Sequence, residues 1–111
     1  MAGRFEISKA KDGDYHFHLK AENGQIILTS QMYKEKSSAE GGIESVRKNA
    51  PNDQRYARKE AHNGEPMFNL KAGNHQVIGT SQLYESVEAR EHGIASVKEN
   101  APTATVHYET A

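Results

Sequence analysis

A repeated phrase limits the folds open to this chain more than any other feature of its sequence. The segment GGIESVRKNAP at 41–51 returns as HGIASVKENAP at 92–102. A shift of 51 residues aligns 13–50 with 64–101 without a gap, and 19 of the 38 aligned positions are identical. Two copies are too few for a solenoid. We therefore expect one pseudo-twofold domain over 1–111, built from repeat one (3–53) and repeat two (54–109).

Each copy begins with a pattern that is typical of short strands. Tyr15, Phe17 and Leu19 alternate with polar residues, and Phe68 and Leu70 repeat the pattern in the second copy. Such alternation predicts strands with one buried face. A third strand follows in each copy, QIILTS in the first and QVIGTS in the second. With the upstream run around Phe5, each copy is predicted to open as a three-stranded meander.

Short polar dipeptides separate these strands. Asp12-Gly13, Asn23-Gly24 and Asn63-Gly64 stand at three of the turns, and Gly73-Asn74 stands at the fourth. The first three favour the positive φ angles of a tight type I′ turn. His75 takes the place of the turn glycine in the second copy, so only the type of that turn is in doubt.

The apolar spacing then changes to that of a helix in both copies. Ile43 and Val46 share one helical face, as do Ile94 and Val97. Pro51 and Pro102 end the two helices, because the residue before proline disfavours the helical conformation. We expect Ser86 to cap the second helix, Ser37 to form a capping box with Glu40 in the first, and Asn49 and Asn100 to take left-handed turns at the ends.

Gly42 and Gly93 lie inside the predicted helices at equivalent positions of the two copies. A glycine there costs about 1 kcal/mol relative to alanine. Its presence in both copies predicts that the helix backbone packs closely against another element.

An extended run follows each helix, QRYARKEA at 54–61 and TATVHYET at 103–110. The first run ends copy one and also stands where the first strand of copy two belongs, so no linker separates the copies. The expected fold is α+β. Two tandem β(3)-α-β repeats share one antiparallel-rich sheet with exchanged C-terminal strands, and two helices pack on the sheet.

Composition excludes several classes of function. The chain has no cysteine, which removes disulfides, thiol nucleophiles and zinc–thiolate sites. The net charge is −1, and Lys/Arg against Asp/Glu count eight to seven in 1–51 and six to eight in 52–111. Neither half therefore has the basic balance of a nucleic-acid-binding domain. The sequence has no apolar stretch that suits a signal peptide or a membrane span, so we expect a cytoplasmic monomer.

The segments NGQIILTSQMYKEKSSAEGGIESVRKNA and NHQVIGTSQLYESVEAREHGIASVKENA resemble the YegP-like family of small bacterial proteins. Three features carry the resemblance over nearly the whole chain: the NG turn, the T-S-x-x-Y pattern and the G-I-x-S-V-x-x-N-A pattern. The resemblance implies tandem β(3)-α-β units in one sheet with exchanged C-terminal strands. It implies no catalytic or binding residues.

A polar set retained in both copies is the main candidate for a binding surface. Its members are Ser30, Gln31, Tyr33, Ser81, Gln82 and Tyr84. They could present two equal surfaces to a protein partner. In the alternative, which we prefer, the tyrosines pack against the helices while the serines and glutamines satisfy the backbone.

A basic strand offers a second candidate. Arg55, Arg58 and Lys59 surround Tyr56, and aromatic and basic side chains together bind single-stranded nucleic acid. Asp53 dilutes this patch, and the second copy does not keep it. Nucleic acid is therefore the less favoured partner.

Catalysis and cofactor binding have weaker support. His16 and His18 could hold a metal from one face of a strand, but the second copy has Met67 and Asn69 there, and no third ligand stands out. The retained serines have neither a glycine elbow nor a retained histidine nearby. The sequence therefore predicts a non-enzymatic binding or interaction module without a cofactor.

Overall fold

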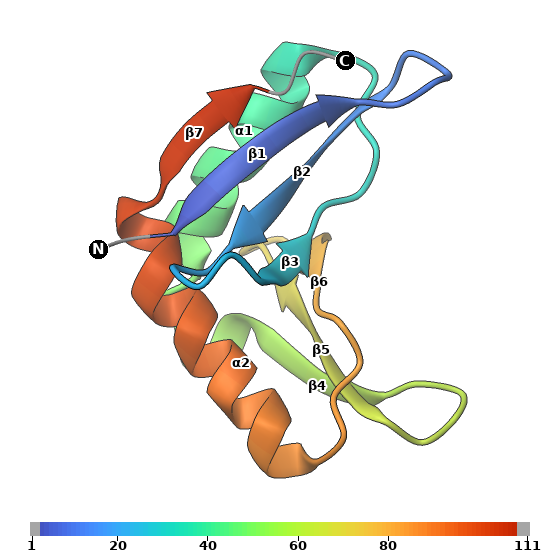
Figure 1. The fold of residues 1–111 in the computed structure, drawn as a ribbon, viewed down its shortest axis with the longest axis vertical. Helices are drawn as coiled ribbons and strands as arrows, with labels where there is room; N and C mark the ends of the chain where they lie inside the picture. Colours follow the sequence, from blue (N-terminus) through green and yellow to red (C-terminus); the bar gives the residue numbers. More distant parts are fainter. Residues whose placement is uncertain (1–2, 109–111) are drawn as a thin grey trace.

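The computed structural model describes residues 3–108 and shows one seven-stranded sheet with two helices (Figure 1). The elements are β1 (Arg4–Lys9), β2 (Tyr15–Lys20), β3 (Ile26–Thr29), α1 (Lys36–Asn49), β4 (Tyr56–Glu60), β5 (Pro66–Lys71), β6 (Val77–Thr80), α2 (Val87–Asn100) and β7 (Thr105–Tyr108). A short 3-10 turn precedes β4 and another precedes β7. The strand order is β4-β5-β6-β3-β2-β1-β7.

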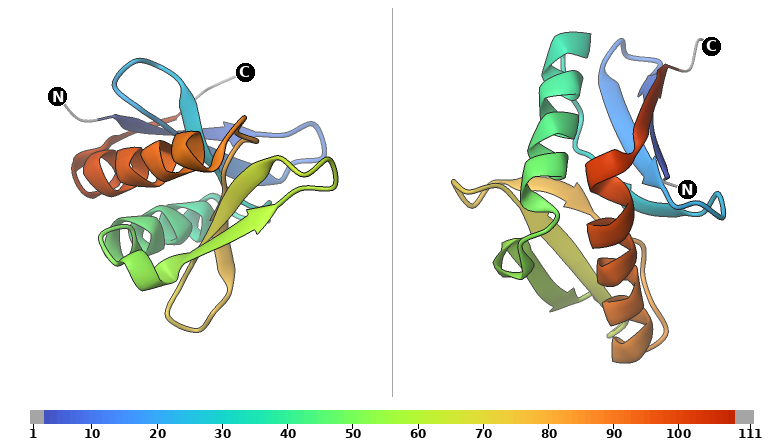
Figure 2. Two further views of the ribbon diagram at one scale, coloured as in Figure 1. Left: turned by 90° about the horizontal axis from the view of Figure 1, so that it is seen from below. Right: turned by 90° about the vertical axis from the view of Figure 1, so that its left-hand side faces the viewer.

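The sheet consists of two halves that meet at a single backbone pair. Half one contains β7, β1, β2 and β3, and half two contains β4, β5 and β6. Strands β3 and β6 pair only through Thr29 and Thr80, and the strands of the two halves run in clearly different directions (Figure 1). The two helices lie on the same side of the bent sheet and are offset along the long axis of the molecule (Figure 2). Each helix packs on both halves, α1 on β2 and β6, and α2 on β5 and β3.

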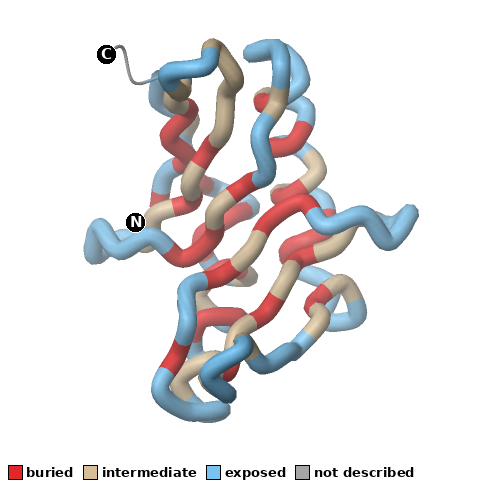
Figure 3. The backbone as a smooth tube through the Cα atoms, turned by 90° about the vertical axis from the view of Figure 1, so that its right-hand side faces the viewer, coloured by how far each residue is buried: buried red, intermediate tan, exposed pale blue. Residues whose placement is uncertain are grey.

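The core lies between the sheet and the helices. Phe5, Phe17 and Phe68 are fully buried, and they lie at strand positions that alternate with polar residues. The predicted helix faces join them, since Ile43 and Ile94 are each at most 2% exposed. Buried stretches run through the middle of the molecule while the hairpin ends are exposed (Figure 3).

The exchange of the last strand is visible in the pairing of β7. This strand leaves α2 of repeat two and pairs in parallel with β1 of repeat one, from Arg4↔Thr105 to Ile7↔Tyr108. Strand β4 leaves α1 of repeat one and pairs antiparallel with β5 of repeat two. The predicted fold class is confirmed, including the double role of the strand after the first helix.

Close packing explains why both repeats keep a glycine in the middle of the helix. A Cβ atom added at Gly42 would lie 2.9 Å from the Cζ atom of Tyr33, and one added at Gly93 would lie 2.5 Å from the Cζ atom of Tyr84. Both distances are shorter than van der Waals contact allows. The glycines are therefore needed because a tyrosine ring lies directly on the middle of each helix.

The type I′ turn predicted for the three Asp-Gly and Asn-Gly turns is wrong, and the turn at His75, whose type the sequence leaves open, has the same geometry as the other three. A type I′ turn needs two consecutive residues with positive φ, but each turn has one: Gly13, Gly24, Gly64 or His75. The Asp or Asn before each of these residues instead accepts a hydrogen bond from the N–H group two residues further on, as Asn23 Oδ1 does from Gln25 at 3.0 Å. This side-chain turn is why the polar residue is kept while the glycine can be replaced.

The helix ends are predicted correctly in part. Ser86 caps α2 by accepting from the N–H group of Ala89. The capping box of Ser37 and Glu40 is wrong, because α1 begins after Glu35 and Ser37 already lies inside it. The left-handed turns are also wrong. Asn49 and Asn100 stay helical, and their side chains donate to the carbonyl oxygens four residues earlier.

Candidate binding groove

The retained serines are committed to the backbone of the sheet. Ser30 Oγ accepts from the N–H group of Phe17 at 2.8 Å and donates to the carbonyl oxygen of Gln31 at 2.7 Å. Ser81 makes the same two bonds to Phe68 and Gln82. Because each hydroxyl already donates its proton and is 8% exposed, neither serine is placed to act as a nucleophile.

A groove opens where the two halves of the sheet meet. It has a volume of about 330 Å³, and four positions from each repeat line it. These residues are Ile26, Thr29, Ser30, Gln31, Val77, Thr80, Ser81 and Gln82. The paired residues Thr29 and Thr80 lie at its centre, so the groove lies on the pseudo-twofold axis of the molecule.

The groove belongs to the face of the sheet that is turned away from the helices. Thr29 pairs with His18 on β2, and Thr80 pairs with Asn69 on β5. These partners alternate with buried residues such as Phe17 and Phe68, whose side chains point to the helices. No helix of the described chain therefore covers the groove.

The candidate surface thus divides into two parts. Gln31 and Gln82 are exposed at the groove. Tyr33 and Tyr84 lie on the other side of the sheet, where their rings stack on Phe17 and Phe68 at 6.3 Å between centroids. Burial raises the pKa of Tyr84. The tyrosines therefore pack on the helices, as the alternative interpretation of this set expected.

The basic strand does not form the surface that nucleic acid requires. Tyr56 is 6% exposed, and its hydroxyl donates to the carbonyl oxygen of Ala50 at 2.7 Å. Its ring packs on Phe68 in the core, and burial raises its pKa. A buried ring cannot stack on a base, so the interpretation of Tyr56 as a nucleic-acid contact is wrong.

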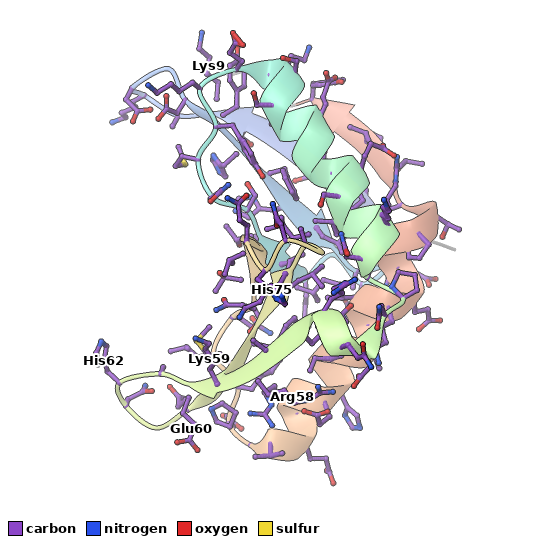
Figure 4. The ribbon with its side chains drawn as sticks, turned by 180° about the vertical axis from the view of Figure 1, so that it is seen from behind. Lys9, Arg58, Lys59, Glu60, His62 and His75 are labelled. Atoms are coloured by element: carbon purple, nitrogen blue, oxygen red, sulfur yellow. The ribbon has the colours of Figure 1, made fainter. Side chains whose placement is uncertain are left out.

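Of the basic residues beside Tyr56, Arg58 is already paired with acidic side chains. The guanidinium of Arg58 binds Glu91 at 2.9 Å and Asp53 at 3.0 Å, and Lys98 binds the same oxygen of Asp53 at 2.6 Å. The bonds from Lys98 and Arg58 lower the pKa of Asp53 to about 2. Lys59 is exposed along β4 (Figure 4), and Arg55 lies against Gly73. The four residues therefore do not form one basic surface.

The histidines do not gather into a metal site. The rings of His16 and His18 are 4.9 Å apart on β2, whereas His62 and His75 lie on different hairpins (Figure 4). Among residues 3–108, no three histidine, aspartate or glutamate side chains are placed to hold an ion. Likewise, no helix in this range is long and apolar enough to cross a membrane.

The apolar walls of the groove were not predicted. Ile26 and Val77 are 40% and 36% exposed, although their position in an apolar run favours burial. A β-bulge in each hairpin inserts one extra residue after them, which turns them outward. The signal was present in the repeat, since both copies keep two β-branched residues before the T-S pair.

Comparison with known proteins places the chain in a family. A model of the domain of unknown function DUF1508 matches it twice, over 10–56 and 61–107. The chain belongs to the YegP-like UPF0339 family. YegP of Escherichia coli K12 is 56% identical over 110 residues, which cover 99% of this chain and 100% of YegP. A UPF0339 protein of Acinetobacter baylyi is 63% identical over 106 residues, or 96% of each chain.

Two solved structures of the family share the fold. The solution structure of YegP from Escherichia coli matches with a TM-score of 0.94 at 55% identity and covers 100% of this chain and 96% of YegP. The solution structure of a UPF0339 protein from Shewanella oneidensis matches with a TM-score of 0.91 at 53% identity, covering 97% and 92%. The predicted family is confirmed. None of these names assigns an activity, an enzyme class or a nucleic-acid ligand.

Proposed function

We propose that this member of the YegP-like family is a small non-enzymatic binding module whose binding surface is the groove around Thr29 and Thr80. One observation carries the proposal: both repeats bring the same short set of side chains to one groove on the pseudo-twofold axis. The 51-residue shift relates Gln31 to Gln82 and Ile26 to Val77. A surface that both copies build together gives a reason for keeping the polar set twice.

The chemistry of the groove supports binding rather than catalysis. None of its eight lining residues carries an ionisable side chain. General acid–base catalysis needs a titratable group within hydrogen-bond reach of the substrate. The two serine hydroxyls donate their protons to backbone carbonyls. The groove can therefore offer hydrogen bonds and apolar contact, but it lacks an activated nucleophile.

The proposal includes the setting of the module. It acts as a single pseudo-twofold domain over 1–111, a cytoplasmic monomer that binds a protein partner. Each helix packs on both halves of the sheet, so neither half has a helix that belongs to it alone. This packing supports a single domain.

The test compares capture by three immobilised full-length proteins: wild type, the double variant Gln31→Ala/Gln82→Ala, and the control Glu88→Ala on the exposed side of α2. Because both glutamines are exposed, the double variant should retain the wild-type circular dichroism spectrum and melting temperature. A partner bound by wild type and Glu88→Ala but lost by the double variant supports the groove. Equal capture by all three proteins rejects it.

A further inference from the structure

The lining of the groove restricts the charge of what it binds. In a chain with 26% charged residues, the eight lining residues include none. A carboxylate, phosphate or ammonium group placed at the centre of the groove, between Thr29 and Thr80, would lose water without meeting a counter-charge in the lining, which is costly. The chemical match is therefore to an uncharged ligand with both amide-type hydrogen-bonding groups and apolar groups.

The two ends of the groove are equivalent. Strands β3 and β6 are antiparallel at Thr29 and Thr80, so the chain beyond Thr29 runs toward Val77 and the chain beyond Thr80 runs toward Ile26. Each end therefore combines one glutamine of one repeat with one apolar side chain of the other.

The glutamine side chains have the hydrogen-bonding groups that a peptide backbone requires. A carboxamide carries both a donor and an acceptor. In an extended chain, the N–H and C=O groups of one residue point to the same side, so one carboxamide can bind both of them. Alternate side chains of such a segment point to opposite faces, which would place apolar ones against Ile26 or Val77.

Further exposed apolar side chains follow the groove residues along the chain. Six large apolar side chains are exposed among the described residues: Ile26, Met32, Val77, Leu83, Val87 and Tyr108. Four of them form two repeat-related pairs, Ile26 with Val77 and Met32 with Leu83. Met32 and Leu83 are each 48% exposed and directly follow the two glutamines. An exposed apolar residue therefore directly follows the glutamine of each repeat, which favours an elongated ligand over a compact one.

We propose that the groove binds an extended, uncharged polypeptide segment, held at its backbone by Gln31 and Gln82 and at its apolar side chains by Ile26 and Val77. This inference rests on the proposed function and names its ligand class. The pseudo-twofold axis adds a specific consequence: the two glutamines contribute equally, and a segment binds in either chain direction.

The experiment selects peptides of about ten residues from a random display library on the full-length protein. Affinities of the selected peptides are then measured for wild type, Gln31→Ala, Gln82→Ala and the control Lys59→Ala on β4. We expect peptides without charged residues at their centre. Each glutamine variant should weaken binding by a similar factor, roughly 2- to 10-fold for a lost hydrogen bond, and Lys59→Ala should leave the affinity unchanged. N-methylation of the central peptide amides should also weaken binding.

Other outcomes separate this inference from the proposed function. Selected peptides that are charged, or a groove-dependent partner that is a nucleic acid or a small molecule, would overturn the peptide inference and leave the groove as the binding surface. Peptides that bind both glutamine variants as tightly as wild type would overturn both. Unequal loss for Gln31→Ala and Gln82→Ala, beyond a factor of about ten, would overturn the equivalence of the two ends.

Discussion

The two edges of the sheet differ, although the repeat would make them alike. Strand β1 is covered on its outer side by β7, and its residues Phe5 and Ile7 are at most 2% exposed. Strand β4 occupies the equivalent place in half two, where Tyr56 matches Phe5 and Arg58 matches Ile7 after the 51-residue shift. No described strand pairs with the outer side of β4. Ile7 is thus apolar on the strand that β7 covers, whereas its equivalent Arg58 is charged on the strand that no described strand covers.

Equivalent glutamates on the two helices bind different partners, in line with the difference between the two sheet edges. Glu40 of α1 accepts a hydrogen bond from the hydroxyl of Tyr108 on β7. Its equivalent in α2, Glu91, pairs instead with Arg58. Arg58, Lys59 and Glu60 follow one another along the open edge (Figure 4). Charged residues on an edge strand oppose pairing with another chain, so half two replaces a covering strand with charge.

The crosswise contacts between repeats are kept despite this difference. Arg47 of α1 lies 5.5 Å from the ring of Phe5 and donates to the carbonyl oxygen of Ala104, just before β7. Its equivalent Lys98 of α2 lies 5.6 Å from the ring of Tyr56 and binds Asp53, just before β4. Each helix therefore holds the segment that leaves the other helix. The repeats agree where they interlock, and they diverge at the outer side of their first strands, which β7 covers in half one and no described strand covers in half two.

Removing β7 should have the largest effect, because it converts the covered edge into an open apolar one. Burying an isoleucine or phenylalanine is worth about 1.5–3 kcal/mol, so uncovering Phe5 and Ile7 should lower the free energy of unfolding by up to about 3–6 kcal/mol. A chain truncated after Thr103 should therefore be largely unfolded or self-associated. Urea unfolding and sedimentation velocity of this variant measure the effect, and wild-type stability as a monomer would contradict it.

A substitution at Gly79, one residue before the Thr29–Thr80 pair, should give the next largest effect. Leu28 and Gly79 are equivalent in the repeat, and a Cβ atom at Gly79 would lie 2.6 Å from the Cγ atom of Leu28. Only one large side chain fits there, so Gly79→Leu should destabilise by about 1–3 kcal/mol. The exchange variant Leu28→Gly/Gly79→Leu should recover part of this loss in chemical denaturation. A Gly79→Leu protein as stable as wild type would show that the space is not shared.

Arg58→Ile makes the open edge resemble the covered one. An exposed ion pair contributes about 0–1 kcal/mol, so the monomer should lose little stability. The apolar edge should instead pair with a second copy, and sedimentation equilibrium should show concentration-dependent dimers. Lys59→Ala, on the same strand, is the control and should stay monomeric. If Arg58→Ile behaves like that control, the charge at this position does not protect the edge.

The smallest effect concerns a turn in which the repeats differ. His75 has φ of 70° where its equivalent Gly24 has 84°. For a residue with a Cβ atom, this left-handed conformation costs about 1–2 kcal/mol. Replacing His75 by glycine removes that cost, but glycine loses more conformational entropy on folding, which offsets part of the stabilisation. His75→Gly should thus raise the free energy of unfolding by about 0.5–1 kcal/mol, and the reverse change Gly24→His should lower it. Thermal unfolding of both variants gives the comparison, and a loss of stability in His75→Gly would contradict it.

The sequence was sufficient for the fold because the repeat supplied long-range information. Two helices, two meanders and a strand shared between copies all follow from a shift of 51 residues. The burial of Tyr56 could also have been predicted from the same shift, which aligns it with Phe5. The basic residues on either side of Tyr56 favour an exposed strand, whereas the position of Tyr56 in the repeat favours burial.

Other features depend on geometry that the pattern does not carry. The parallel pairing of β7 with β1 has no counterpart in the first copy, so the repeat could not indicate it. The outward turn of Ile26 and Val77 depends on a bulge between Leu19 and Lys20 and on its equivalent in half two. The groove itself arises because β3 and β6 share only one residue pair. Both glutamines of the candidate surface were identified, but their apolar neighbours were not.

The central claim is that each repeat is completed by the other, and a fragment of the chain tests it directly. Residues 1–51 contain β1, β2, β3 and α1 but lack β7, β6 and the residues of α2 that cover the core. A heteronuclear NMR spectrum and a sedimentation measurement on this fragment should show an unfolded chain, or a dimer in which a second copy supplies the missing contacts. A well-dispersed spectrum from a monomer would contradict the account and show that the first repeat folds alone.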